Sequence, residues 1–175
     1  MKGNLIITPE NVQAFERSMD MLDNSIKEMQ RVAHDMMPET LVNFGLDTAL
    51  KDFCDTINQG GALSITYQSI DMQQVVVNQT TAITIYRIVQ ELVNNIIKHA
   101  SARSALVQLS NEHNTINITV EDDGKGFNKE LLNPARGIGW SNILNRVDFL
   151  NGKADIVSEP GKGTSVNIGL QYTPG

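Results

Sequence analysis

Three polar side chains stand at helical spacing in residues 78–100, a segment that also carries an apolar stripe. Glu91, Asn95 and Lys98 are four and three residues apart, so a helix would place them on one face, opposite an apolar stripe. His99 flanks that line. A carboxylate, an amide and an ammonium in a row fit either a solvated helix face or a site for a charged ligand.

A second group of chemistry-bearing residues is Asp122-Asp123-Gly124-Lys125-Gly126, which directly follows an alternating, strand-like segment. The Asp122 carboxylate, at the end of a strand, is placed to accept a hydrogen bond from an exocyclic amine. Gly124 and Gly126 carry no side chain, so a flat ring can approach the backbone. The plain alternative is a turn, since Asp-Gly is a common turn dipeptide.

Two more glycine motifs follow. Gly137-Ile138-Gly139 precedes an expected helix, whose free N-terminal amides and dipole favour a phosphate. Gly161-Lys162-Gly163-Thr164 leads into the last expected strand, where Gly163 and Thr164 could close the wall of a pocket. Each motif is weak evidence alone, whereas all of them in this order are a strong indication of a nucleotide site.

Four motifs therefore stand in sequence: Glu91-x-x-x-Asn95-x-x-Lys98-His99-Ala100, Asp122-x-Gly124-x-Gly126, Gly137-x-Gly139 and Gly161-x-Gly163-Thr164. They resemble the N, G1 and G2 boxes and the closing glycine motif of the ATPase superfamily that DNA gyrase, mismatch-repair proteins, a heat-shock chaperone and histidine kinases share. Arg87-Ile-Val-Gln90-Glu91 looks most like bacterial sensor histidine kinases related to nitrate and cold sensors. The resemblance covers about residues 36–170.

The resemblance implies an ATP pocket with a Mg²⁺ ion. Asn95 would ligate Mg²⁺, Asp122 would recognise the adenine amine, and Lys98 and His99 would lie near the phosphates. Glu91 matches the position that activates water in hydrolysing relatives, and in a kinase it would polarise the acceptor histidine. The whole implied set is Glu91, Asn95, Lys98, His99, Asp122, Gly124, Gly126, Gly137, Gly139, Gly163 and Thr164, with a short lid over residues 127–136.

The elements that must position these residues alternate between helical and strand patterns. Helices are expected over 46–59, 78–100 and 140–150, and strands over 62–69, around 105–109 and 116–120, and over 154–158 and 164–170. Antiparallel strand pairs between helices predict an α+β fold, a two-layer α/β sandwich. The resemblance implies the Bergerat-type ATPase fold. Asn43-Phe44-Gly45 reads as a break, and Gly60-Gly61 as a helix stop.

A long N-terminal helix is expected to precede this sandwich, with Thr8 as its cap and Pro9 in its first turn. Apolar residues recur at alternating spacings of three and four from Val12 to Met36, a seam typical of helix pairing. The seam favours a homodimer over a helix lying on its own domain. We expect residues 1–44 to be the C-terminal part of a dimerisation and histidine-phosphotransfer hairpin with its linker, and residues 45–175 the catalytic domain.

His34 is the tempting phosphoacceptor, because Asp35 follows it as in many sensor kinases of this group. Three features disfavour it. The first is that Pro38-x-x-Leu41-x-x-x-Gly45-Leu46-x-x-Ala49-Leu50 resembles the segment that joins the second hairpin helix to the ATPase domain. The family pattern has a glutamine where this chain has Glu39, and Pro38 interrupts the helix in which an acceptor should lie. Residues 9–37 then resemble the second hairpin helix, which places the acceptor upstream of Met1.

Bulk composition limits the partners. A formal charge of −6 argues against nucleic acid, which needs a basic face. The single cysteine, Cys54, excludes an internal disulfide and stands among apolar residues, so we expect a buried small hydrophobe. No apolar stretch is long enough to span a membrane, so any membrane attachment would come from segments missing from this chain.

The resemblance implies a cytoplasmic catalytic fragment of an inner-membrane sensor histidine kinase. It would bind Mg-ATP, transfer the γ-phosphate to a histidine and signal to a response regulator protein. The alternatives are an ATP-hydrolysing machine of the gyrase or mismatch-repair type and a serine kinase of the same superfamily.

Overall fold

The computed structural model describes residues 12, 15–22, 38–128 and 138–172, which divide into two compact units, residues 1–37 and 38–175. In the first unit residues 15–22 are helical, as the seam predicts, and Phe15, Met19 and Leu22 are exposed. The remainder of the predicted helix, including His34, lies outside the described residues. The predicted domain boundary at 44/45 falls within the first helix of the second unit.

That helix, α2 (Glu39–Gly60), contains the expected break. Gly45 has φ 85° and ψ 177°, so the backbone leaves the helix there and resumes it immediately. An extra helical turn precedes Gly45 because the Pro38 carbonyl accepts the first helical hydrogen bond, from Leu41 at 3.0 Å. The helix ends where Gly61 adopts a left-handed conformation, as the glycine pair predicts.

Cys54 lies on the buried face of α2 as a free, fully buried thiol. Burial raises the pKa of the Cys54 thiol to about 12, with the neighbouring Asp55 carboxylate adding to the shift. The thiol therefore stays protonated at neutral pH, which fits the predicted role of a small core side chain.

Five strands form one mixed sheet in the order β1-β2-β3-β5-β4. Only β1 and β2 are parallel, and the three other pairs are antiparallel. His113 and Asn114 both have positive φ in the β2–β3 hairpin, which suits the right-handed twist of its strands. The strands are β1 (Ser64–Ile70), β2 (Ser104–Glu112), β3 (Thr115–Asp122), β4 (Lys153–Ser158) and β5 (Thr164–Gln171).

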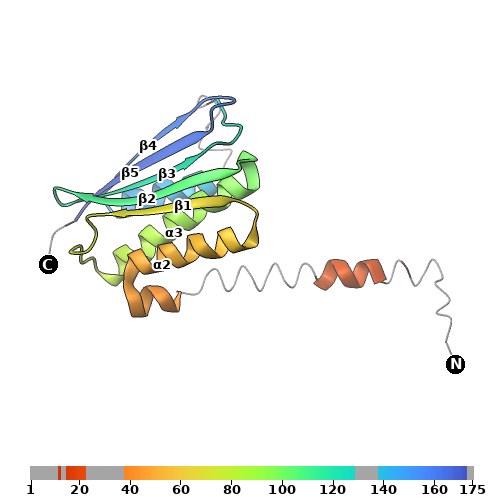
Figure 1. The fold of residues 1–175 in the computed structure, drawn as a ribbon, viewed down its shortest axis with the longest axis horizontal. Helices are drawn as coiled ribbons and strands as arrows, with labels where there is room; N and C mark the ends of the chain where they lie inside the picture. The colour runs from red at the N-terminus through yellow and green to blue at the C-terminus, as the bar shows by residue number, and fades with distance from the viewer. Residues whose placement is uncertain (1–11, 13–14, 23–37, 129–137, 173–175) are drawn as a thin grey trace. The chain divides into compact units, whose positions relative to one another are not determined.

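The helices α2, α3 (Gln79–Asn95) and α4 (Ile138–Phe149) provide the second layer, and α2 and α3 run side by side along one face of the sheet (Figure 1). Strand side chains alternate between buried and exposed, so one face of the sheet meets the helices. The predicted two-layer α+β sandwich is confirmed. The most deeply buried core side chains come from both layers: Leu50, Ile85, Ile88, Val93, Leu109, Ile116, Ile118 and Ile168.

Candidate nucleotide site

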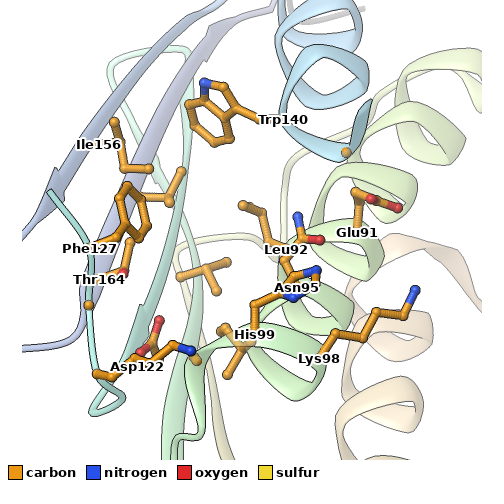
Figure 2. Close-up of a pocket in the computed structure, with 17 residues that line it drawn as sticks. Glu91, Leu92, Asn95, Lys98, His99, Asp122, Phe127, Trp140, Ile156 and Thr164 are labelled. Atoms are coloured by element: carbon orange, nitrogen blue, oxygen red, sulfur yellow. The ribbon is translucent and has the colours of Figure 1, made fainter. Parts of the chain in front are cut away.

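A cavity of about 680 Å³ lies between α3 and the β3, β4 and β5 part of the sheet (Figure 2). Residues from all four predicted motifs line it, although they are up to seventy-three positions apart in the chain (164 − 91). Those predicted residues are Glu91, Asn95, Lys98, His99, Asp122, Gly126, Gly139 and Thr164. Gly124 and Gly163 stand behind the wall, and Gly137 lies outside the described residues.

The helical wall changes its winding within the site. The segment predicted as one helix to Ala100 is α-helical to Asn95 and continues as π-helix η1 (Ile96–Ala100). A π turn contains more residues than an α turn, so it lets Lys98 and His99 both reach the cavity that Asn95 lines. Figure 2 shows Glu91, Asn95 and His99 following one another along this wall.

Asp122 stands at the opposite end of the cavity from Glu91, at the last position of β3 (Figure 2). Its Oδ1 accepts a hydrogen bond from the Gly124 N–H at 2.8 Å, which fixes the direction of the carboxyl group. Burial raises the pKa of Asp122 above its ordinary value, although the Gly124 and Thr164 amides oppose the shift. A desolvated carboxylate with a fixed orientation is a strong acceptor for an amine.

Three glycines near Asp122 are required by close contacts between backbones. A Cβ on Gly124 would meet the Ala100 carbonyl oxygen, and one on Gly163 would meet the carbonyl oxygen of Asp122. Gly126 has φ +58°, and its Cβ would meet the Glu159 carbonyl oxygen. These glycines therefore bring protein segments together around the cavity, and Gly126 also lines it.

The loop after β3 is tied to the end of η1 and to the start of β2. The Lys125 N–H donates to the Ala100 carbonyl at 2.8 Å. The Asp123 carboxylate accepts hydrogen bonds from the Arg103 and Ser104 amides and from the Ser104 hydroxyl. These three donors, the hydroxyl first, lower the pKa of Asp123 to about 2. The Lys125 hydrogen bond thus holds the Asp122 loop against the helical wall, and the Asp123 hydrogen bonds hold it against the start of β2.

Helix α4 begins directly over the Glu91–Asn95 pair. A Cβ on Gly139 would lie 2.7 Å from Glu91 Oε1 and 3.3 Å from Asn95 Oδ1. The first turn of α4 is therefore within contact distance of both side chains, and its positive end faces the cavity. A helix N-terminus in this position is able to hold an anion, although an anion there would need a cation to offset the nearby Glu91 carboxylate.

The apolar and aromatic walls of the cavity are not among the predicted ligand-binding residues, although Phe127 was expected to begin the lid. Residues 129–136 of that lid lie outside the described residues. Phe127 and Ile156 lie on the sheet side, with Trp140 at the α4 end (Figure 2). Phe127 and Trp140 each follow a motif glycine directly, and that position was the signal available in the sequence. Lys125 and the apolar residues Leu92, Ile96, Ala100, Val120 and Val166 complete the lining.

The part of the chain that builds this cavity matches a known family by sequence. Residues 80–174, more than half of the chain, match the family described as histidine kinase-, DNA gyrase B-, and HSP90-like ATPase. The chain belongs to this family. The relation to the nitrate- and cold-sensor subgroup stays a prediction.

Relatives place this ATPase domain among sensor histidine kinases. The chain is 27% identical over 140 residues to the sensor histidine kinase MctS of Rhizobium johnstonii and 26% identical over 154 residues to the sensor histidine kinase LiaS of Bacillus subtilis. The alignments cover 79% and 88% of this chain, but only 30% and 42% of those relatives. The chain therefore spans less than half of their length.

Solved structures agree with the fold. The histidine kinase domain of a blue-light activated histidine kinase from Erythrobacter litoralis is 30% identical to this chain, with a TM-score of 0.58. The match covers 71% of this chain and 60% of that one. Within the residues described for the present structure, no helix is both long and apolar enough to cross a membrane.

Proposed function

We propose that this ATPase domain binds Mg-ATP and transfers the γ-phosphate to a histidine of the sensor kinase to which it belongs. The observation that carries the proposal is one cavity with an amine-accepting carboxylate, Asp122, at one end and the N-terminus of α4 at the other. Apolar walls between them suit a purine ring and exclude water from it.

The base would lie against Phe127 and Ile156, with its exocyclic amine donating to Asp122. The phosphates would then extend toward the first turn of α4, where Gly139 approaches Glu91 and Asn95. Lys98 and His99 line the same part of the helical wall and would contribute positive charge and hydrogen-bond donors.

Asn95 would be the protein ligand of Mg²⁺, through its Oδ1. A hard cation with oxygen ligands fits this position, because Mg²⁺ commonly takes few protein ligands and several phosphate oxygens. Among the residues that the structure describes, no group of three His, Cys, Asp or Glu side chains could hold a metal ion by itself. When bound, the ion would neutralise negative charge on the phosphates.

In the transfer step, a histidine ring nitrogen would attack the γ-phosphorus while the bond to the β,γ-bridging oxygen breaks and ADP leaves. Catalysis of this kind depends on positioning and on charge neutralisation. Glu91 would accept a hydrogen bond from the other ring nitrogen, which makes the attacking nitrogen more nucleophilic. The domain would thus supply the nucleotide and the polarising carboxylate, and the acceptor would come from elsewhere.

The acceptor is proposed to be a histidine other than His34. Pro38 has extended dihedral angles, φ −60° and ψ 130°, and helix α2 begins after it. Pro38 follows His34 after only three residues, whereas the helix that carries an acceptor histidine would be expected to continue well beyond it.

We expect the 175-residue chain to bind ATP without forming acid-labile phosphate. The measurement is incubation with γ-labelled Mg-ATP followed by acid and alkaline treatment. His34→Ala, compared with His113→Ala at an exposed hairpin position, tests the assignment. Labelling of the wild-type chain that only His34→Ala abolishes would contradict this expectation, and steady ATP turnover would favour a hydrolysing relative.

Nucleotide binding itself has an intrinsic reporter. Trp140 is the only tryptophan of the chain and lines the cavity. Mg-ATP is expected to change its fluorescence with saturation, because the ligand would displace water near the indole. An unchanged signal together with no heat of binding in calorimetry would contradict the proposed function.

The full kinase is proposed to work as a homodimer through residues 9–37, with residues 1–44 as hairpin and linker and 45–175 as catalytic domain. Its downstream partner would be a response regulator protein, as for two-component sensors generally. The catalytic domain would lie on the cytoplasmic side of an inner-membrane sensor, and no role in nucleic-acid binding is proposed, given the net charge of −6.

A further inference from the structure

Ser158, the last residue of β4, is buried and its hydroxyl contacts three groups. It accepts a hydrogen bond from the Phe127 N–H at 2.9 Å. It lies 3.1 Å from the Gly163 carbonyl oxygen and 2.9 Å from Thr164 Oγ1. One side chain thus joins the sheet, the turn before β5 and the residue that follows Gly126.

Counting donors fixes the direction of these hydrogen bonds. The Phe127 amide can only donate and the Gly163 carbonyl can only accept, whereas a serine hydroxyl has one proton. All three contacts form together only if Ser158 donates to Gly163 and the Thr164 hydroxyl donates to Ser158. If Ser158 donated to Thr164 instead, it would have no proton for the Gly163 carbonyl. Leaving a buried carbonyl without that hydrogen bond is unfavourable.

In that arrangement the proton of the Thr164 hydroxyl is engaged by Ser158, so toward a ligand in the cavity that Thr164 lines this hydroxyl can only accept hydrogen bonds. Thr164 is paired across the strands with Asp122, and its amide supports the Asp122 carboxylate. Two acceptors therefore stand next to each other at one end of the cavity (Figure 2). Two adjacent acceptors can bind an exocyclic amine of the base and disfavour a carbonyl at the same position.

The Phe127 ring depends on the same oxygen. Its backbone N–H is held by Ser158, and its ring lines the cavity beside Thr164 and Ile156 (Figure 2). Loss of the Ser158 hydroxyl would therefore free the Thr164 hydroxyl to rotate. It would also remove the acceptor of the Phe127 N–H hydrogen bond.

We propose that Ser158 is a positioning residue for base specificity, which orients the Thr164 hydroxyl as an acceptor and anchors the Phe127 wall. The inference rests on the proposed function, since it assigns this end of the cavity to the base. Ser158 itself does not line the cavity and would not touch the nucleotide.

The test compares ATP with inosine triphosphate, which carries a carbonyl in place of the exocyclic amine. We expect Ser158→Ala to lower the ratio of the ATP affinity to the inosine triphosphate affinity about fivefold, which is the effect of one hydrogen bond. Both are measured by titration of Trp140 fluorescence and by calorimetry. Ser165→Ala is the matched control, because Ser165 is a β5 serine bonded to the exposed Glu121, and it should leave the ratio unchanged.

Thr164→Val provides the second variant. It should lower the ratio by a similar factor, and adding Ser158→Ala should not change the ratio further, because both variants act on it through the Thr164 hydroxyl. Loss of the Phe127 anchor should weaken the binding of both nucleotides alike and leave their ratio unaffected. An unchanged ratio in Ser158→Ala, or in Thr164→Val if the first variant does not fold, would overturn the inference. A wild-type chain that binds neither nucleotide would instead contradict the proposed function, and the inference with it.

Discussion

Asp122→Ala is expected to weaken ATP binding by roughly 10- to 100-fold, the effect of a hydrogen bond to a charged group. The carboxylate is fixed by the Gly124 and Thr164 amides and lines the cavity. The Thr164 hydroxyl beside it is an uncharged, weaker acceptor, so it would retain only part of the interaction with the amine. Titration of the Trp140 fluorescence with Mg-ATP measures the loss. Asp52→Ala is the control, because Asp52 is an exposed carboxylate of α2 and does not line the cavity.

Asp122→Asn should weaken ATP binding as much as Asp122→Ala does, but it should not destabilise the fold. Asparagine keeps an oxygen for the Gly124 amide but can present its own N–H groups to the adenine amine. Burial raises the pKa of Asp122 above 3.8, so the folded state disfavours the ionised carboxyl. A neutral amide of the same shape removes that penalty.

The pH dependence of this effect has a definite sign. The folded chain retains the Asp122 proton at higher pH than the unfolded chain, whose carboxyl titrates near 3.8. The contribution of Asp122 to stability therefore falls as pH rises from that value through its raised pKa. The free energy of unfolding of Asp122→Asn relative to wild type should increase over that window. The ATP affinity of the wild type should rise over the same window, since the ionised carboxylate is a stronger acceptor than the protonated carboxyl. A stability difference that is constant with pH would contradict this account.

Asp123 should show the reverse behaviour. Its pKa of about 2 in the folded state lies below 3.8, so its stabilising contribution is present above pH 3.8 and is lost as pH falls toward 2. Two adjacent carboxyls thus differ because one is buried in the cavity wall and the other accepts three hydrogen bonds at an exposed position.

The sequence predicted the layers of the fold because its apolar residues repeat with the period of each element. Ile85, Ile88 and Val89 are spaced for a helix face, Ile116, Ile118 and Val120 for a strand face, and all are buried. The break at Gly45 and the stop at Gly61 were predictable for the same kind of reason, since glycine adopts positive φ at low cost.

The sequence predicted most of the residues that line the site, but it did not predict how they are arranged around the cavity. The π turn over Ile96–Ala100 depends on tertiary contacts, such as the one between Lys125 and Ala100, which no local pattern encodes. Ser158 carries no motif signal, because its role comes from two strands and a loop that meet at one hydroxyl. Trp140 lines the cavity because Gly139 brings α4 over Glu91.

The largest expected effect on stability comes from Gly163→Ala. Gly163 has φ +77°, and a Cβ there would meet the Asp122 carbonyl oxygen and lie 3.0 Å from the Asp122 carbonyl carbon. These are backbone atoms of a paired strand, so they cannot move aside without separating β3 from β5 at the site. We expect a loss of roughly 3 kcal/mol or more in the free energy of unfolding, from backbone strain and the clash together. Urea denaturation measures it.

Gly161→Ala separates the clash from the strain. Gly161 has φ +81°, yet a Cβ there would have nothing within 4 Å, so only backbone strain of about 1 kcal/mol is expected. Because Gly163 borders Asp122, Gly163→Ala should also reduce ATP binding, whereas Gly161→Ala should leave it intact. Equal losses of stability in the two variants would mean that the contact with Asp122 is not what requires glycine at position 163. The glycines of the closing motif would then be needed only for the positive φ of the turn. The backbone beside Thr164 and Asp122 would have room for a side chain at position 163.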